Sequence, residues 1–246
     1  DMGTIRSFRY TLLLCRPTSA TTLARSYTVT SPAMTEPSST QSSTAQSLST
    51  ENTELVLASS SRWRRELLDR LQLPYRCHSP DIDETPHNGE TPHALVHRLA
   101  LSKANAVSAH FPHHCIIGSD QVAVFEGDIL GKPHTTEKAC ANLARFSGQR
   151  VTFLTGLALL DTRHQRHQVH VEPFEVVFRT LSTQEIENYV TKEQPLDSAG
   201  SFRMEGLGIA LFERLEGRDP SALIGLPLIA LCDMLRQAGL DPLGAP

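Results

Sequence analysis

The sequence lacks the features that mark several classes of protein. None of its apolar runs approaches the roughly 18 residues that span a bilayer, which argues against a membrane protein. Its five cysteines are scattered and form no CxxC pair, so they indicate reduced thiols rather than a disulfide framework or a zinc site. The net charge of -4 argues against a protein that coats nucleic acid, although it allows a local basic pocket. We therefore expect a cytoplasmic protein that binds neither a membrane nor a nucleic-acid polymer.

Residues 1–52 differ in composition from the rest of the chain. From residue 35 to 53 the sequence is mostly Ser, Thr, Gln and Glu, which bury too little apolar surface to become ordered. Arginines and hydroxyl residues precede this tract, as in a mitochondrial transit peptide. The favoured interpretation is a non-native extension with Met34 as the true initiator, and mitochondrial import through residues 1–33 is the alternative. In both cases residues 53–246 are expected to form one α/β domain.

The first informative stretch predicts a buried strand followed by a helix. The apolar run LVLA begins at Leu55, and leucines at helical spacing follow from Leu67. Between them lie three serines (59–61) and several arginines, and this turn suits a polyanion such as the phosphates of a nucleotide. The alternative is an ordinary serine-capped helix. Basic residues in a first turn oppose the helix dipole, however, so a negative partner is expected.

Acidic residues crowd the loop that spans residues 79–90. Asp81, Asp83 and Glu84 stand among prolines and an Asn-Gly pair. Acid clusters in loops are usually solvated. Beside an arginine-rich turn, these carboxylates could instead hold a hard divalent cation through oxygen ligands.

A helix is predicted from residue 91 to about residue 110. Its inward-facing residues are expected to be Leu95, Leu99, Ala106 and Val107. Lys103 lies on the same helix, where a lysine is by default solvated. His93 and His97 are four residues apart and could share a metal ion, but without a further ligand at suitable spacing an exposed polar face is favoured.

The stretch CIIGSDQVAV, residues 115–124, is expected to be a buried strand interrupted by Gly-Ser-Asp-Gln. Asp120 is costly in such a strand unless it is paired, bound to metal or used in chemistry. Gly118 permits close backbone approach at this point. A hairpin turn at Gly127 then leads to GKP, where Lys132 can point into a cleft.

Glycines surround Glu205 in AGSFRMEGLGIAL, residues 199–211, which indicates a loop shaped for function rather than for packing. The other expected elements are helices at 135–146, 182–192 and 226–238 and strands at 149–160, 170–179 and 209–215. Ser182 and Glu185 form a predicted capping box, and Gly239 ends the last helix. Strands that alternate with helices and hairpins predict an α/β domain with a mixed sheet.

Together these motifs resemble the Maf family of nucleoside triphosphate pyrophosphatases. The resemblance covers residues 55–243 and includes ASSSRWRRELL (58–68), SPDIDETP (79–86), the helix bearing Lys103, IIGSDQV (116–122), GKP (131–133) and AGSFRMEG (199–206). Trp63, Gln121 and Glu205 are similar to those of the branch that hydrolyses 7-methyl-GTP. Family members commonly carry proline at the position of Arg62, but this departure removes no reacting group.

The resemblance implies a fold like that of the inosine triphosphatase group, in which an elongated mixed β-sheet carries helices in two lobes around a central cleft. It implies a hydrolase of phosphorus anhydrides that uses a divalent cation (Mg, Mn or Co). Cleavage between the α- and β-phosphates would yield 7-methyl-GMP and pyrophosphate. A homodimer is expected on the resemblance alone.

The residues and the resemblance agree on Asp120, which is expected to activate water for attack on the α-phosphorus, as a general base or with the help of a metal ion. The rival role is metal ligation alone, with Glu84 as second ligand. Because the sequence has no Walker-type loop, dispersed groups would hold the triphosphate. These groups are Ser59, Arg64, Lys103 and Lys132, with Arg65 less well placed at helical spacing.

A base pocket follows from the chemistry of the methylated purine. Methylation at N7 makes guanine cationic, and Trp63 is the single tryptophan of the chain. Stacking of a cationic base on tryptophan contributes about 0.5–2 kcal/mol. Glu205 could accept hydrogen bonds from the guanine N1–H and amine groups, and Gln121 could read a base edge by its amide. The alternative for Trp63 is an aromatic residue that packs in the core.

Three hypotheses follow from the sequence. The first is a pyrophosphatase that acts on 7-methyl-GTP. The second is the same chemistry on dTTP, UTP or another modified nucleotide. The third is a non-catalytic nucleotide sensor that regulates cell division. A sensor has no need of a carboxylate beside the α-phosphorus, so Asp120 favours the first two.

Overall fold

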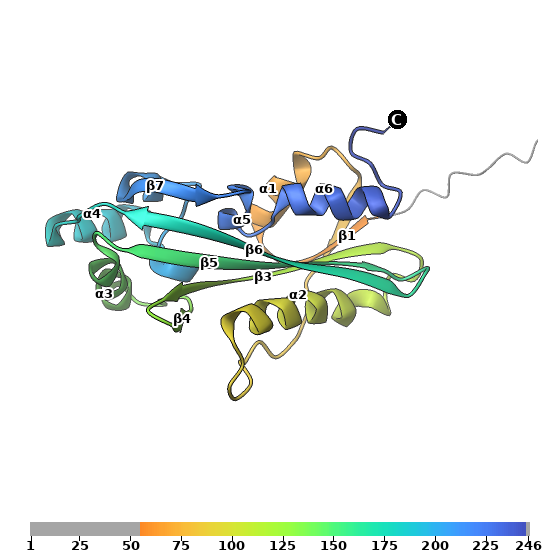
Figure 1. Ribbon diagram of the computed structural model, residues 1–246, viewed down its shortest axis with the longest axis horizontal. Helices are drawn as coiled ribbons and strands as arrows, with labels where there is room; N and C mark the ends of the chain where they lie inside the picture. The colour runs from red at the N-terminus through yellow and green to blue at the C-terminus, as the bar shows by residue number, and fades with distance from the viewer. Residues whose placement is uncertain (1–54, 245–246) are drawn as a thin grey trace, which may run out of the picture. The chain divides into compact units, whose positions relative to one another are not determined.

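The computed structural model describes residues 55–244 and shows one α/β domain (Figure 1). The strands are β1 (Leu55–Ala58), β2 (Tyr75–His78), β3 (Cys115–Phe125), β4 (Asp128–Leu130), β5 (Arg150–Asp161), β6 (Arg166–Phe178) and β7 (Phe212–Gly217). The helices are α1 (Arg62–Asp69), α2 (Pro92–Ser108), α3 (Thr136–Phe146), α4 (Thr183–Glu193), α5 (Ser221–Ile224) and α6 (Leu228–Gln237), with short 3-10 helices η1 (Ala199–Ser201) and η2 (Leu207–Leu211). Within this part of the chain, every helix is too short or too polar to cross a membrane. The predicted extension, residues 1–52, lies outside the described residues.

The strands form a single mixed sheet, as the sequence predicts. Their order is β2-β1-β3-β5-β6-β7, and β4 pairs with β3 as a hairpin arm. The β1–β2 and β1–β3 pairs are parallel, whereas the remaining pairs are antiparallel. The parallel pairs need crossover connections, and α1 and α2 supply them.

Helices cover both faces of the sheet near β1. In Figure 1, α2 lies below the sheet, and α1 and α6 lie above it. Leu55 and Leu57 belong to a core cluster with residues of α1 and α6, whereas Val56 and Ala58 pack with residues of α2. Burial on both faces explains why β1 reads as a continuous apolar run instead of alternating with polar residues.

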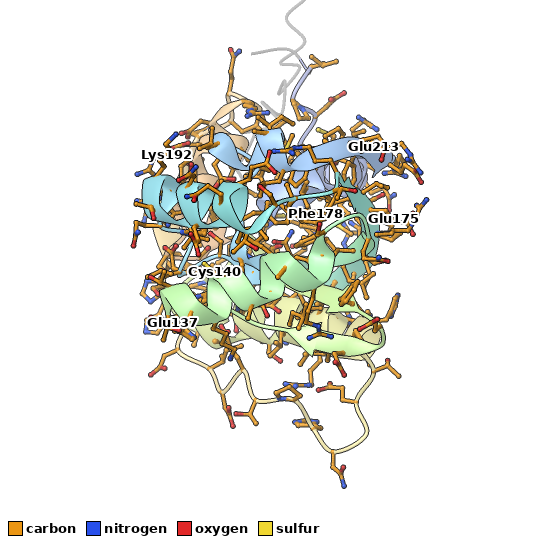
Figure 2. The ribbon with its side chains drawn as sticks, turned by 90° about the vertical axis from the view of Figure 1, so that its left-hand side faces the viewer. Glu137, Cys140, Glu175, Phe178, Lys192 and Glu213 are labelled. Atoms are coloured by element: carbon orange, nitrogen blue, oxygen red, sulfur yellow. The ribbon has the colours of Figure 1, made fainter. Side chains whose placement is uncertain are left out.

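Two separate hydrophobic cores lie along the long strands β3 and β5, each of which supplies residues to both. Val151 and Phe153 of β5 belong to a core with α3 and α4, and Leu157 and Leu159 belong to the core with α1 and α6. One pair of strands therefore connects both cores, in agreement with the two expected lobes. Figure 2 looks onto the first of these ends, where α3 carries Cys140.

Two glycines let α2 lie directly on the sheet. A Cβ atom at Gly118 of β3 would stand 2.0 Å from the carbonyl oxygen of Ala100, and one at Gly156 of β5 would stand 2.1 Å from that of Val96. No other residue fits at such distances. The close approach predicted at Gly118 is confirmed, and it brings Lys103 of α2 over β3.

Several expectations about local structure are wrong. Ala106 is exposed, and Ala104 is the alanine of α2 that packs in the core. Strand β3 continues through Gly-Ser-Asp-Gln without interruption, because antiparallel pairing with β5 holds it along this whole segment. β6 begins at Arg166 inside the expected loop, and η2 occupies the start of the expected strand at 209–215.

Candidate active site

A cavity of about 990 Å³ opens between the two cores. A volume of this size can hold a nucleoside triphosphate. Its lining includes the predicted catalytic, phosphate-binding and base-recognition residues: Ser59, Trp63, Arg64, Glu84, Lys103, Asp120, Gln121, Lys132 and Glu205. Of the three loop carboxylates that could hold a cation, only Glu84 is among them, and Asp81 and Asp83 are exposed outside it. The lining residues come from both ends of the domain, so the fold gathers groups that are far apart in the sequence.

Lys103 and Asp120 form a buried ion pair on the cavity wall. Lys103 Nζ lies 2.6 Å from Asp120 Oδ1, and their side chains are 9% and 10% exposed. The same ammonium lies 2.8 Å from Glu84 Oε1 on the loop before α2. Lys103 is therefore not on a solvated face, because Gly118 and Gly156 bring α2 too close to the sheet for water to surround it.

The charges around Glu84 show that further cations point into the cavity. Burial acts to raise the pKa of Glu84, but the hydrogen bond from Lys103 and the positive charges of Lys103, Lys132 and Arg64 outweigh it, so this pKa lies below its ordinary value. Lys132 itself is exposed in the segment after β4. Three cations therefore act on one carboxylate, which is an arrangement suited to a polyanionic ligand.

The turn after β1 places Arg64 and Ser59 at the cavity. Ser61 is the N-cap of α1, and its hydroxyl accepts a hydrogen bond from the Arg64 backbone amide. The side chain of Arg64 donates from Nε to the carbonyl oxygen of Gly225 at 2.8 Å and from one terminal nitrogen to Ser59 Oγ at 3.5 Å. Burial lowers the pKa of Arg64, against the charges of Asp120 and Glu84 that raise it. These contacts fix the side chain and leave the second terminal nitrogen, Nη2, for a ligand.

Gln121 is held by backbone acceptors that the sequence does not reveal. Its amide nitrogen donates to the carbonyl oxygens of Ala222 at 2.7 Å and Leu223 at 3.2 Å, and to Thr155 Oγ1 at 3.0 Å. The Thr155 hydroxyl donates in turn to Ala222 at 2.9 Å. These contacts fix the amide orientation, so the carbonyl oxygen of Gln121 is the atom available to a ligand.

Glu205 lies at the rim of the cavity, in the glycine-rich loop between η1 and η2. Arg203 orders this loop by donating its backbone amide to Tyr189 Oη at 3.1 Å, and its guanidinium pairs with Asp197. Burial raises the pKa of Glu205 above its ordinary value, and the negative charges of Glu193 and Glu66 act in the same direction. The surroundings therefore disfavour the ionised form of this carboxylate, and a cationic partner would stabilise it.

Trp63 is half-buried in the first turn of α1, facing the cavity. The guanidinium of Arg62 lies over the indole, with Cζ 4.0 Å from the ring centroid. The packing alternative, in which Trp63 is part of a hydrophobic core, is not observed. None of the core clusters among residues 55–244 includes it.

Sequence reasoning missed Ser119, whose hydroxyl lies 2.8 Å from the Gly156 carbonyl oxygen and 2.9 Å from that of Gly225. It also missed His134 and Asp197, which line the cavity. Backbone acceptors such as Gly225 carry no side-chain signal. Only the position of Ser119, next to Asp120 in an apolar strand, could have drawn attention to it.

The described residues include no group of three or more His, Cys, Asp or Glu side chains arranged to hold a metal ion. Glu84 and Asp120 nevertheless converge on one point, the ammonium of Lys103. Mg²⁺ is commonly bound by one or two carboxylates together with substrate phosphates. The residues therefore fit a divalent cation that binds together with a triphosphate, rather than a permanent metal centre held by protein ligands alone.

The chain is similar to several known proteins, in sequence or in structure. The family model described as Maf-like protein matches residues 54–238. The 7-methyl-GTP pyrophosphatase of Chromohalobacter salexigens is 69% identical over 192 residues, which cover 78% of this chain and 100% of that protein. Two solved structures are also similar. The Staphylococcus aureus Ham1 protein has 17% identity and a TM-score of 0.39, with 62% of this chain and 88% of that chain covered. A HAM1 protein from Coxiella burnetii has 14% identity and a TM-score of 0.40, with 75% and 99% covered.

Proposed function

This chain belongs to the family of Maf-like proteins, and from that premise we propose that it hydrolyses 7-methyl-GTP to 7-methyl-GMP and diphosphate. The observation that carries the proposal is the buried Asp120, held by Lys103 in the wall of a nucleotide-sized cavity. A buried carboxylate is costly, and its place beside several cations is what attack on a bound triphosphate requires.

In the proposed mechanism, Asp120 accepts the proton from the water that attacks the α-phosphorus. Lys103 holds the Asp120 carboxylate in place by their 2.6 Å contact. Arg64, Ser59 and Lys132 bind the phosphate oxygens and offset the negative charge that develops on them. Diphosphate then leaves, and 7-methyl-GMP remains with its α-phosphate carrying the oxygen of the water.

A divalent cation (Mg, Mn or Co) is proposed to bind with the substrate, held by Glu84 and Asp120. When bound, it would neutralise phosphate charge and polarise the P–O bonds. Asp120 then has two candidate roles, proton acceptor and ligand, and we favour the first. Loss of the side chain would abolish turnover in either role, so a pH profile of kcat is the measurement that separates them.

We propose that the base is recognised by three residues. Trp63 stacks on the cationic purine, since a delocalised positive charge is attracted to the face of the indole. Glu205 accepts from N1–H and the exocyclic amine, and its negative charge complements the cation. The carbonyl oxygen of Gln121, fixed by Ala222 and Leu223, accepts from a donor on the base edge.

Pyrophosphate release from 7-methyl-GTP, GTP, dTTP, UTP and ITP in the presence of Mg²⁺ or Mn²⁺ tests the proposal. Strong preference for 7-methyl-GTP is expected. Preference for dTTP or UTP would keep the role of Asp120 and overturn the base pocket. Tight binding of one nucleotide without turnover of any would favour the sensor instead. A homodimer and a cytoplasmic location stay predictions, to be tested by sedimentation and by fractionation.

A further inference from the structure

One face of the Trp63 indole carries a planar cation, the guanidinium of Arg62. Arg62 Cζ stands 4.0 Å from the ring centroid. The Arg62 side chain is 65% exposed and lines the cavity, whereas Trp63 is half-buried. Both residues line the cavity, and a base cannot stack on the indole face that the guanidinium covers while the guanidinium is there.

We propose that Arg62 is a built-in competitor of the base, which occupies the stacking position in the free protein and leaves it when the nucleotide binds. This inference rests on the proposed function, because it takes Trp63 as the stacking partner of the base. It adds a residue to base recognition that neither the sequence motifs nor the comparisons assign.

The chemistry of the two occupants is alike. A guanidinium is planar and spreads its positive charge over several atoms, and so does the five-membered ring of a purine methylated at N7. Both gain from the negative face of the indole. One carboxylate adds to this preference: Glu66 Oε1 lies 3.6 Å from Arg62 Nε, and Glu66 is also close enough to Glu205 to raise the pKa of that carboxyl group. The position selects a flat cation.

The structure also supplies a place for Arg62 after displacement. Glu66 lies one helical turn further along α1, and its side chain is 56% exposed. A 3.6 Å contact is loose and can shorten when the guanidinium swings away from the ring. The guanidinium of Arg62 can thus leave the Trp63 ring and stay paired with Glu66.

Competition lowers the apparent affinity for any base that must take the same face. For an exposed cation–π contact, removal of the competitor is expected to tighten binding about three- to six-fold. The gain applies to methylated and unmethylated guanine alike, because both must displace the same group. This common gain distinguishes competition from a purely electrostatic effect, which acts only on the cationic base.

The test is a titration of Trp63 fluorescence with 7-methylguanosine and with guanosine, in wild type, Arg62→Ala and Arg65→Ala. Trp63 is the single tryptophan in the chain, so its emission reports the stacking directly. Nucleosides carry no phosphate, which removes any attraction of Arg62 to the triphosphate. Arg65→Ala removes the same charge from the same turn and leaves Arg62 on the ring, so it serves as the matched control.

We expect Arg62→Ala to lower the dissociation constants of both nucleosides about three- to six-fold. Arg65→Ala should lower neither. Tightening of 7-methylguanosine alone would overturn the proposal in favour of charge repulsion. Unchanged or weaker binding would overturn it as well, and so would the absence of any fluorescence response in wild type. Equal affinity of wild type for the two nucleosides would count against the proposed substrate, while the common gain in Arg62→Ala would still establish the competition.

Discussion

The ammonium of Lys103 and the carboxylate of Asp120 lie 2.6 Å apart, and each side chain is about nine-tenths buried, at 9% and 10% exposed. Two charges taken out of water together depend on each other, because either one left alone loses its compensation. The pair is therefore expected to affect both turnover and the free energy of unfolding, and substitutions of Asp120 and of Lys103 separate the two effects.

Asp120→Asn is expected to lower kcat by about 10²- to 10⁴-fold, because an amide cannot accept the proton of the attacking water. The amide is nearly isosteric and Glu84 still pairs with Lys103, so nucleotide binding, followed by Trp63 fluorescence, should persist. Turnover at the wild-type rate would refute the assigned role.

Lys103→Met is expected to destabilise the domain by about 3–5 kcal/mol, because it leaves the carboxylate of Asp120 buried without its partner. The measurement is urea unfolding. Lys138→Met on the exposed face of α3 is the matched control and should change the free energy of unfolding little. Adding Asp120→Asn to Lys103→Met should restore part of the loss. A double variant as unstable as Lys103→Met alone would contradict this explanation.

Glu205→Gln is expected to reduce the preference for 7-methyl-GTP over GTP about tenfold, or ~1.4 kcal/mol, because the neutral amide no longer complements a cationic base. The ratio of kcat/KM for the two substrates measures this. Glu187→Gln, an exposed glutamate on α4 outside the cavity lining, should leave the ratio unchanged. An unaltered ratio in Glu205→Gln would overturn the specificity assignment.

The raised pKa of Glu205 gives the pH dependence of this preference a definite sign. Below that pKa the side chain is protonated and neutral, so discrimination between 7-methylguanosine and guanosine should decline as the pH falls through it. Glu205→Gln should show no such decline. In the folded protein this carboxyl group binds its proton more strongly than in the unfolded chain, so its ionisation costs stability at higher pH. The substitution should therefore not lower the melting temperature at neutral pH.

Gly118→Ala is expected to destabilise the domain by about 1–3 kcal/mol or more, because the new Cβ would stand 2.0 Å from the carbonyl oxygen of Ala100 and push α2 off the sheet. Thermal unfolding measures this. Gly131→Ala is the control: within the described residues, nothing lies within 4 Å of a Cβ atom at Gly131. Equal stability of the two variants would show that α2 can shift without cost.

Much of this candidate site could be predicted from the sequence, because several of its charged residues stand where the local structure disfavours a charge. A carboxylate in an apolar strand at Asp120 and arginines in a first helical turn are both unfavourable without a partner. The hairpin at Gly127 and the capping box of Ser182 and Glu185 follow from local rules and are confirmed.

The burial of Lys103 could not be predicted in the same way. It depends on how closely α2 approaches two strands, and this distance is set by Gly118 and Gly156, which are 38 positions apart in the printed sequence. The orientation of the Gln121 amide likewise depends on hydrogen bonds to the carbonyl oxygens of Ala222 and Leu223. Every residue type has a backbone carbonyl group, so the sequence does not reveal these acceptors.

The shared acceptor at Gly225 has a consequence for the order in which the enzyme is made. Its carbonyl oxygen anchors both Arg64 and Ser119, and it stands 161 residues after Arg64 in the chain. During synthesis, the turn that carries Arg64 therefore leaves the ribosome long before the acceptor that orients Arg64. A nascent chain that has not reached Gly225 lacks the acceptor of the Arg64 Nε hydrogen bond, so Arg64 can take its position in the site only when synthesis is nearly complete.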